Sequence, residues 1–237
     1  MTALEFRLKL SSMYSIRIPY SYQCARTYPL PAPSTIKGLC ANALWQKEGG
    51  QPAKIMGDIH KASLGATSRA IYPIEISSCT VRVIPIDARL KQFAFTPYID
   101  CMIAFKQEAE ELAGKIAEAL SVSPVYLGDS ESLVSVIPDT LRLISTAKDM
   151  EEGDYVSINS LVKFDYIKEN EVSEKGVVLY MQDDPIATDA ILDRCLAPLK
   201  QKGDSYYPMD TFSFLSSVKG SLFKGENIIA FFAQLQG

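Results

Sequence analysis

Residues 11–35 are the part of the sequence that most restricts how the chain can fold. Four prolines interrupt this segment: Pro19, Pro29, Pro31 and Pro33. Each proline removes a backbone N–H donor and favours extended geometry in the residue before it, so the segment cannot be a helix. The preceding residues 2–10 alternate between apolar and charged side chains, which predicts a half-buried strand. Residues 36–45 then show helical spacing, and Ser34 or Thr35 can cap the free amides of that helix.

The middle of the chain predicts an extended β-hairpin. Residues 51–69 have a weak pattern, which we interpret as a short helix followed by a loop. Residues 74–86 and 96–105 are rich in β-forming side chains, and a basic connector that holds Arg89 and Lys91 joins them. The protruding part of this hairpin, the thumb, is expected at about residues 82–97.

The next elements complete an α+β pattern. Residues 107–120 predict an amphipathic helix, and strand-like residues follow a turn at Gly128. The order strand, helix, hairpin, helix, strand fits a split β-α-β unit. Residues 1–148 are therefore expected to form a ferredoxin-like (RRM-like) lobe with a protruding β-hairpin thumb.

An acidic, glycine-containing stretch at residues 149–155 predicts a boundary between this lobe and a smaller one. The expected second lobe, residues 149–237, is β-rich and contains one predicted helix near residues 185–195. Four short β runs support that expectation: residues 156–167, 176–181, 211–216 and 227–233.

The charge of the chain is unevenly distributed. The formal net charge is −4, yet residues 1–100 carry 12 Lys and Arg against 6 Asp and Glu, and residues 101–237 carry 12 against 22. A basic half of this kind suggests an anionic partner. With 47% hydrophobic and 22% charged residues, the composition excludes intrinsic disorder.

Location and cofactors follow from what the sequence does not contain. No apolar run approaches the roughly 18 residues of a membrane span, and residues 1–10 have no apolar segment typical of a signal peptide. We therefore expect a cytoplasmic protein with reduced cysteines and no membrane partner. The five cysteines are at least 16 residues apart, and His60 is the one histidine, so no metal or other cofactor is expected.

Motifs for catalysis are also missing from the sequence. It contains no GxSxG elbow, no Walker A motif and no GxGxxG motif. We therefore expect no catalytic residue, and the sequence favours binding over catalysis.

Residues 14–37 combine aromatic rings with cations, a mixture that suits single-stranded nucleic acid. The aromatic members are Tyr14, Tyr20, Tyr22 and Tyr28, and the cationic members are Arg17, Arg26 and Lys37. The helix start at Ser34 and Thr35 could accept a phosphate on its free amides. The alternative interpretation is a Tyr- and Pro-rich loop that packs on the core.

Two further basic segments are candidates for binding, each with a structural alternative. The predicted hairpin contains Arg82, Arg89 and Lys91, which could instead be a solvated sheet edge. Near the C-terminus, Gly220 and Gly225 flank Lys219 and Lys224, where glycine permits close approach to a polyanion. A hairpin turn is the alternative for that segment.

Two motifs give the sequence a family resemblance. TYPLPAPSTIKGL at residues 27–39 and YLGDSESLVSV at residues 126–136 resemble the CRISPR-associated Cas-five family. That family belongs to the repeat-associated mysterious protein (RAMP) superfamily, within type I Cascade complexes of antiviral defence. The resemblance covers about residues 1–145 and is closest to the type I-A branch.

The resemblance implies a ribonucleoprotein subunit that caps one end of the Cascade backbone and binds the 5′ handle of the CRISPR RNA. The thumb, mapped to residues 83–96, would contact a Cas-seven backbone subunit, and Arg82, Arg89 and Lys91 would lie near the RNA. The acidic second lobe could meet the Cascade large subunit. The handle-binding residues implied by the matching motif are Arg17, Tyr20, Tyr28, Ser34, Thr35 and Lys37.

Two alternatives to an RNA-binding, non-catalytic subunit stay open at this point. The type I-C branch of the family cleaves precursor CRISPR RNA with a Tyr/Lys/His site, and Tyr20, Lys61 and His60 would be the equivalents here. His60 precedes Lys61 and lies upstream of the hairpin, so the chain departs from that pattern. The second alternative is an unrelated ferredoxin-like scaffold protein.

Overall fold

The computed structural model describes residues 1–21, 24–83, 87–129, 131–186 and 191–234; the side chains of residues 82–83, 87–89 and 169–171 lie outside the described part. Strand β1 (Thr2–Leu10) lies at the centre of the main sheet, whose order is β3-β6-β1-β8-β7, with β9 also paired to β1. Its other strands are β3 (Ser63–Ala70), β6 (Tyr98–Phe105), β7 (Val125–Tyr126), β8 (Leu133–Val136) and β9 (Arg142–Ile144). The three α-helices of the described residues are α1 (Pro33–Glu48), α2 (Pro52–Ala62) and α3 (Glu110–Val122).

The order of these elements confirms the ferredoxin-like prediction. Along the chain they run β1, α1 and α2, β3, β6, α3, β8, and in the sheet β6 lies between β3 and β1, with antiparallel neighbours throughout. This is the split β-α-β arrangement repeated twice. Strand β3 corrects the loop expected within residues 51–69: its small and polar residues gave little strand signal because neighbours cover both faces.

Strand β1 is buried on both faces, which corrects the half-buried prediction. Leu4, Phe6 and Leu8 pack into the core beneath the helices. On the opposite face, Ala3 packs with a second sheet formed by β10 (Ala147–Met150), β19 (Gly220–Lys224) and β20 (Ile229–Ala233). Of the charged positions of β1, Glu5 and Arg7 therefore face protein, whereas Lys9 near the end of the strand is exposed.

Glu5 is the clearest consequence, because only 1% of it is exposed. Its carboxylate accepts hydrogen bonds from the backbone amides of Glu226 (2.9 Å), Asn227 (2.8 Å) and Ile228 (3.1 Å). Gly225 precedes these amides, and a Cβ there would lie 2.5 Å from a Glu5 oxygen. The turn between β19 and β20 is thus closed around a buried anion.

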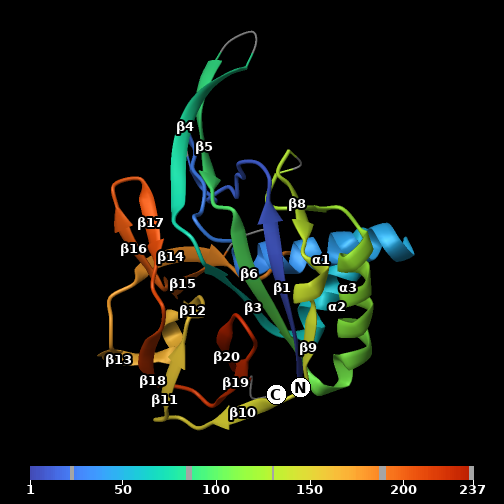
Figure 1. Cartoon of the computed structure of the whole chain (residues 1–237), viewed down its shortest axis with the longest axis vertical. Helices are drawn as coiled ribbons and strands as arrows, with labels where there is room; N and C mark the ends of the chain where they lie inside the picture. The colour runs from blue at the N-terminus through green and yellow to red at the C-terminus, as the bar shows by residue number, and fades with distance from the viewer. Residues whose placement is uncertain (22–23, 84–86, 130, 187–190, 235–237) are drawn as a thin grey trace.

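The hairpin differs in extent from the prediction. It consists of β4 (Ile74–Val83) and β5 (Asp87–Phe95), paired from Glu75↔Phe95 to Val83↔Asp87. Residues 98–105, expected as its second strand, instead form β6 of the main sheet. Figure 1 shows the hairpin projecting well beyond the rest of the molecule.

Two strands flank the base of the hairpin. Strand β2 (Cys24–Ala25) adds to β5 in parallel, and β17 (Ser205–Pro208), itself paired with β16 (Leu199–Lys202), adds to β4. Residues from both sides of the predicted boundary therefore share one sheet. The main core likewise includes Met181, Ala197 and Leu199. Side chains therefore pack together across residue 148, and the division into two lobes there stays a prediction.

The remaining strands form two small antiparallel sheets, as expected for a β-rich C-terminal region. One contains β11 (Tyr155–Ile158), β18 (Phe212–Ser216) and β13 (Ile167–Val172); the other contains β12 (Val162–Lys163), β15 (Leu192–Ala197) and β14 (Val177–Gln182). The residues that the structure describes also include three 3-10 turns: η1 (Gln107–Ala109), η2 (Pro138–Thr140) and η3 (Phe164–Tyr166).

The helix predicted near residues 185–195 is wrong where it can be compared. Leu192 begins β15, whose central position between β12 and β14 supplies hydrogen-bond partners on both edges. Residues 187–190 of that prediction lie outside the described part. Among the helices described, none is both long and apolar enough to cross a membrane.

We expect Glu5→Gln to lower the free energy of unfolding by about 2 kcal/mol, because an amide NH₂ would replace an oxygen that accepts from a backbone N–H. Urea unfolding followed by circular dichroism measures the change. Glu226→Gln is the matched control: its side chain is exposed and ion-paired with Arg142 at the surface, so a change within about 0.5 kcal/mol is expected. Equal effects of the two variants would contradict a stabilising role for the buried carboxylate.

Candidate nucleic-acid interface

Two hollows meet at the first turn of α1, and together we call them the α1 groove. The smaller, the Arg17 hollow, has a volume of about 270 Å³; the larger, the Tyr126 hollow, about 680 Å³. Both are lined by Ser34, Thr35, Gly128 and Gln182. The groove therefore joins the two sequence motifs that carry the family resemblance, although they are about 90 residues apart.

Gly128 of the second motif lies against residues 15 and 16 because it has no side chain. Its φ is +90°, and a Cβ would lie 2.3 Å from the carbonyl oxygen of Ser15. The two residues form an isolated parallel β-bridge. Only glycine combines this backbone conformation with such a close approach, so the turn fixes residues 14–17 beside the groove.

The first turn of α1 presents free amides to the groove. Pro33 is the first helical residue, and the preceding Ala32 provides no side-chain cap. Ser34 and Thr35 lie inside the helix, so the prediction that one of them caps it is wrong. Their backbone N–H groups have no intrahelical acceptor, and no acidic residue occupies this turn, so the helix start can attract an anion.

Some of the predicted binding residues are exposed at the surface, and others are buried. Arg17 is exposed and lines the Arg17 hollow, Arg26 is exposed, and Tyr20 is 76% exposed with φ +61°. Tyr22 lies outside the described residues. The backbones of Arg82 and Arg89 pair within the hairpin, but their side chains are outside the described part.

Tyr28 and Lys37 correct the predicted set, because both are buried. The Tyr28 hydroxyl donates a hydrogen bond to the backbone oxygen of Tyr180, and burial raises its pKa to about 12. Lys37 is 2% exposed, and its Nζ lies 2.6 Å from Oδ1 of Asp183. Tyr28 still lines the Arg17 hollow, whereas Lys37 lines neither hollow.

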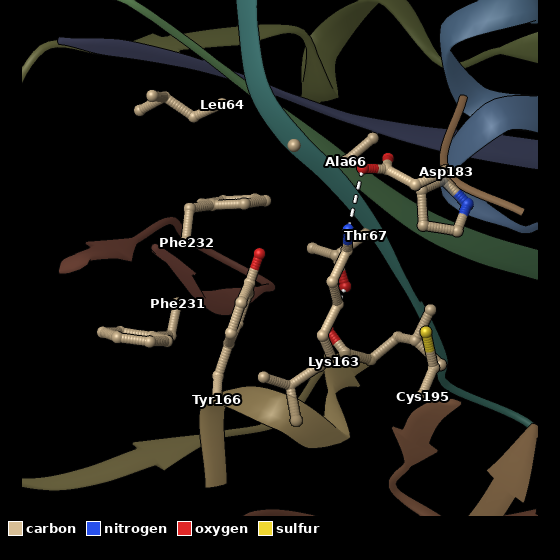
Figure 2. Close-up of a pocket in the computed structure, with 13 residues that line it drawn as sticks. Leu64, Ala66, Thr67, Lys163, Tyr166, Asp183, Cys195, Phe231 and Phe232 are labelled. Carbon is tan, nitrogen blue, oxygen red and sulfur yellow. Dashed lines mark hydrogen bonds and ion pairs between the residues drawn. The ribbon is translucent and has the colours of Figure 1, made fainter. Parts of the chain in front are cut away.

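Lys37 belongs to a buried network of charges that holds residues 182–185 against α1. Asp183 also accepts from Lys163 Nζ at 3.0 Å, and Lys163 pairs with Asp193 at 2.9 Å. Burial alone would raise the pKa of Asp183, but Lys37 and Lys163 outweigh it and lower the pKa. In Figure 2 Lys163 points toward Asp183, and both residues line a small cavity. The network therefore positions Gln182, one wall of the α1 groove.

His60 and Lys61 are not brought together. His60 Nδ1 lies 3.3 Å from Lys37 Nζ and its Nε2 lies 3.8 Å from Asp184, whereas Lys61 lines a separate hollow between α2 and α3. Burial, followed by the charge of Lys37, lowers the pKa of His60. Adjacent helical positions point about 100° apart, which explains the separation.

Lys91 also has a partner that the sequence did not reveal. It lies in β5, not in a connector, and its Nζ lies 2.8 Å from Oδ2 of Asp129 in the glycine turn. The Ser132 hydroxyl donates to the same carboxylate. This ion pair fastens the base of the hairpin to the edge of the α1 groove.

Gly220 does not form an open loop. It begins strand β19, where a Cβ would lie 2.3 Å from the Phe231 ring, so packing between strands explains the glycine. Lys224 is exposed at the end of the same strand, and neither residue lines the α1 groove. The described residues contain no group of His, Cys, Asp and Glu that could hold a metal ion.

Comparison of the sequence with known protein families identifies the family of the chain. Residues 4–190 match the family described as CRISPR-associated protein (Cas_Cas5). The chain belongs to the CRISPR-associated Cas-five family. Both motifs that form the α1 groove fall within the matched residues. Among curated protein sequences, none matches this Cas-five chain.

Solved structures support the fold of the Cas-five chain. A CRISPR protein from Archaeoglobus fulgidus is similar with a TM-score of 0.64 and 15% identity, covering 98% of this chain and 100% of that one. A chain of a CRISPR RNA-guided surveillance complex has a TM-score of 0.47 and 13% identity, with 90% of this chain and 91% of that one covered. At 15% identity, the similarity to the Archaeoglobus fulgidus protein establishes a shared fold.

The charge network predicts an order of stabilities. Asp183→Asn removes the counter-ion of buried Lys37 and should lower the free energy of unfolding by about 3–5 kcal/mol. Lys37→Met should cost less, because Asp183 keeps Lys163, and the double variant Lys37→Met/Asp183→Asn should recover part of the loss. Urea unfolding of the three variants tests this order; a Lys37→Met loss equal to or above that of Asp183→Asn would contradict it.

Proposed function

We propose that this Cas-five chain is a non-catalytic RNA-binding subunit of a type I Cascade interference complex, of the type I-A branch. It caps the complex at the 5′ handle of the CRISPR RNA and acts in the cytoplasm. The observation that carries the proposal is the α1 groove, which combines the exposed Arg17 with free helix amides at a glycine turn.

The groove suits a phosphodiester backbone for electrostatic reasons. Amides at a helix start donate to phosphate oxygens, and the helix dipole favours negative charge there. Arg17 adds a guanidinium that forms paired hydrogen bonds with phosphate. Asp129 also lines the hollow, but Lys91 lies 2.8 Å from it and offsets its charge.

The hairpin supports the second part of the proposal, contact with a Cas-seven backbone subunit. It projects away from the body of the molecule (Figure 1), and Val81, Leu90 and Phe95 are exposed along it. Apolar side chains on a protruding ribbon suit a protein partner better than solvent. The Lys91–Asp129 pair would hold the ribbon in a fixed position relative to the RNA.

For the acidic C-terminal residues, the Cascade large subunit is the partner proposed.

The network around His60 favours binding over catalysis. A general base must take up a proton, yet burial and the Lys37 ammonium, 3.3 Å from His60 Nδ1, lower the pKa of His60 and disfavour its protonated form. Lys61, the other residue of the alternative, lines a different hollow. Among the residues that the structure describes, His60 and Lys61, which the cleavage alternative pairs, do not lie together, whereas binding groups gather at the α1 groove.

RNA binding should depend on Arg17. We expect Arg17→Glu to weaken binding of an RNA with the repeat-derived 5′ handle at least tenfold, and wild-type affinity to fall as salt rises. Fluorescence anisotropy with handle and scrambled RNA, for the chain alone and with its Cas-seven partner, measures this. Lys115→Glu on α3 is the control, expected within twofold of wild type. Equal affinity for handle and scrambled RNA would overturn the proposal.

Cleavage is tested separately. Wild-type protein incubated with precursor repeat RNA and EDTA should leave the RNA intact on a denaturing gel. Cleavage that disappears in His60→Ala would instead establish the endoribonuclease alternative. Since His60 lies beside buried Lys37, thermal unfolding of His60→Ala should be measured alongside, to separate loss of activity from loss of structure.

A further inference from the structure

The Tyr126 hollow differs in chemistry from the neighbouring Arg17 hollow. None of its lining residues carries a charged side chain: it combines the amides of Asn42 and Gln182 with the apolar surfaces of Leu39, Met56 and Tyr126. The Arg17 hollow instead holds Arg17 and Asp129. Charge is thus confined to one end of the α1 groove.

A neutral hollow with these side chains suits an uncharged planar ring. Asn and Gln amides both donate and accept, which matches the mixed edges of nucleobases. Tyr126 is 39% exposed, so its ring is available for stacking. A volume of about 680 Å³ is within the usual range for ligand sites, which bury a small molecule on several sides.

The two hollows share a wall, and this continuity indicates what occupies the larger one. Ser34, Thr35, Gly128 and Gln182 line both, so a phosphate at the first turn of α1 would lie next to the Tyr126 hollow. Gly128 has no side chain to separate them. A nucleotide can therefore place its phosphate in the Arg17 hollow and its base in the Tyr126 hollow.

Parts of the larger hollow are held in place before any ligand arrives. Gln182 Nε2 donates to the backbone oxygen of Asp184 at 2.6 Å, which orients its amide. The adjacent Asp183 is fixed by Lys37 and Lys163. An oriented amide loses little conformational entropy on binding, and this favours recognition of a base.

We propose that the Tyr126 hollow binds one unpaired nucleobase of the RNA whose phosphate lies in the Arg17 hollow. Tyr126 stacks on the base, and Asn42 and Gln182 bind its edge. This inference rests on the proposed RNA-binding function and adds to it a base-specific subsite.

An abasic scan of the handle RNA tests the subsite. One abasic nucleotide is introduced at each handle position in turn, and affinities are measured by fluorescence anisotropy. For wild type we expect one position at which the missing base weakens binding roughly 5- to 150-fold, the range for one stacked base. Tyr126→Ala should weaken binding of intact RNA similarly and abolish sensitivity at that position, whereas Tyr126→Phe keeps both.

Two controls separate stacking from other effects. Tyr155→Ala removes an exposed tyrosine on β11 that lines neither hollow, and it should leave the scan unchanged. Arg17→Glu should weaken binding of every RNA while retaining the sensitive position.

Photocrosslinking tests the subsite without any variant that must fold. Wild type bound to RNA with 5-iodouridine at each handle position in turn should be labelled at Tyr126 from the position that the abasic scan identifies. Titration with nucleoside monophosphates shows whether a free nucleotide also enters.

The failures of the two proposals are distinguishable. If wild type prefers handle RNA, yet Tyr126→Ala keeps the full abasic profile and no crosslink reaches Tyr126, the subsite is overturned and the RNA-binding function stands. If wild type shows no preference for handle RNA, the RNA-binding function itself fails. If Tyr126→Ala leaves RNA binding unchanged but prevents assembly with the Cas-seven partner, the hollow is a protein interface, which also overturns the base site.

Discussion

The burial of β1 on both faces is the constraint on which the rest of the structure depends. A ferredoxin-like sheet usually has one face free, yet here the β10-β19-β20 sheet covers the face opposite the helices. Glu5 and Arg7 on β1 then need internal partners, because an unpaired buried charge costs several kcal/mol. Glu5 takes three backbone amides, and Arg7 pairs with Asp100 at 2.6 Å and donates to Asn227 at 2.9 Å. The N-terminal strand and the C-terminal turn therefore require one another.

The α1 groove follows from how the chain leaves β1. The extended segment after Leu10 is fastened at three points: Tyr14 bridges Ala94 of the hairpin, Ser15 bridges Gly128, and Arg17 bridges Thr27. The prolines of this segment limit its alternative conformations, so less entropy is lost when it is ordered. The segment thus both packs on the core and reaches the surface: Tyr14 is buried, its hydroxyl 2.5 Å from the Pro29 carbonyl oxygen, whereas Arg17 is exposed in the Arg17 hollow.

The parts of the fold that were predictable from sequence have local signals. The alternation of residues 2–10, the apolar stripe of α3 and the turn at Gly128 identify their elements and, in order, the ferredoxin-like plan. The sequence does not predict β3 or the strand beginning at Leu192, because their burial comes from distant neighbours, which a window of sequence does not contain. For the same reason it predicts the second strand of the hairpin at residues 96–105, one strand later than β5.

The site was predictable in position but not in composition, because counting cations does not reveal their counter-ions. Lys37 and Lys91 look like ligands for RNA until Asp183 and Asp129, at positions 146 and 38 residues away, are placed beside them. Both lysines fix the groove instead: one holds the Gln182 wall and the other joins the hairpin to the glycine turn. Because the charges of Lys37 and Lys91 are offset by internal partners, fewer cations are left to attract RNA over long distances. Selectivity would then depend on short-range groups that the fold holds in place. For the proposed role of holding one RNA end in one register, such fixed, weakly charged contacts are better suited than a uniformly basic surface, which binds any polyanion.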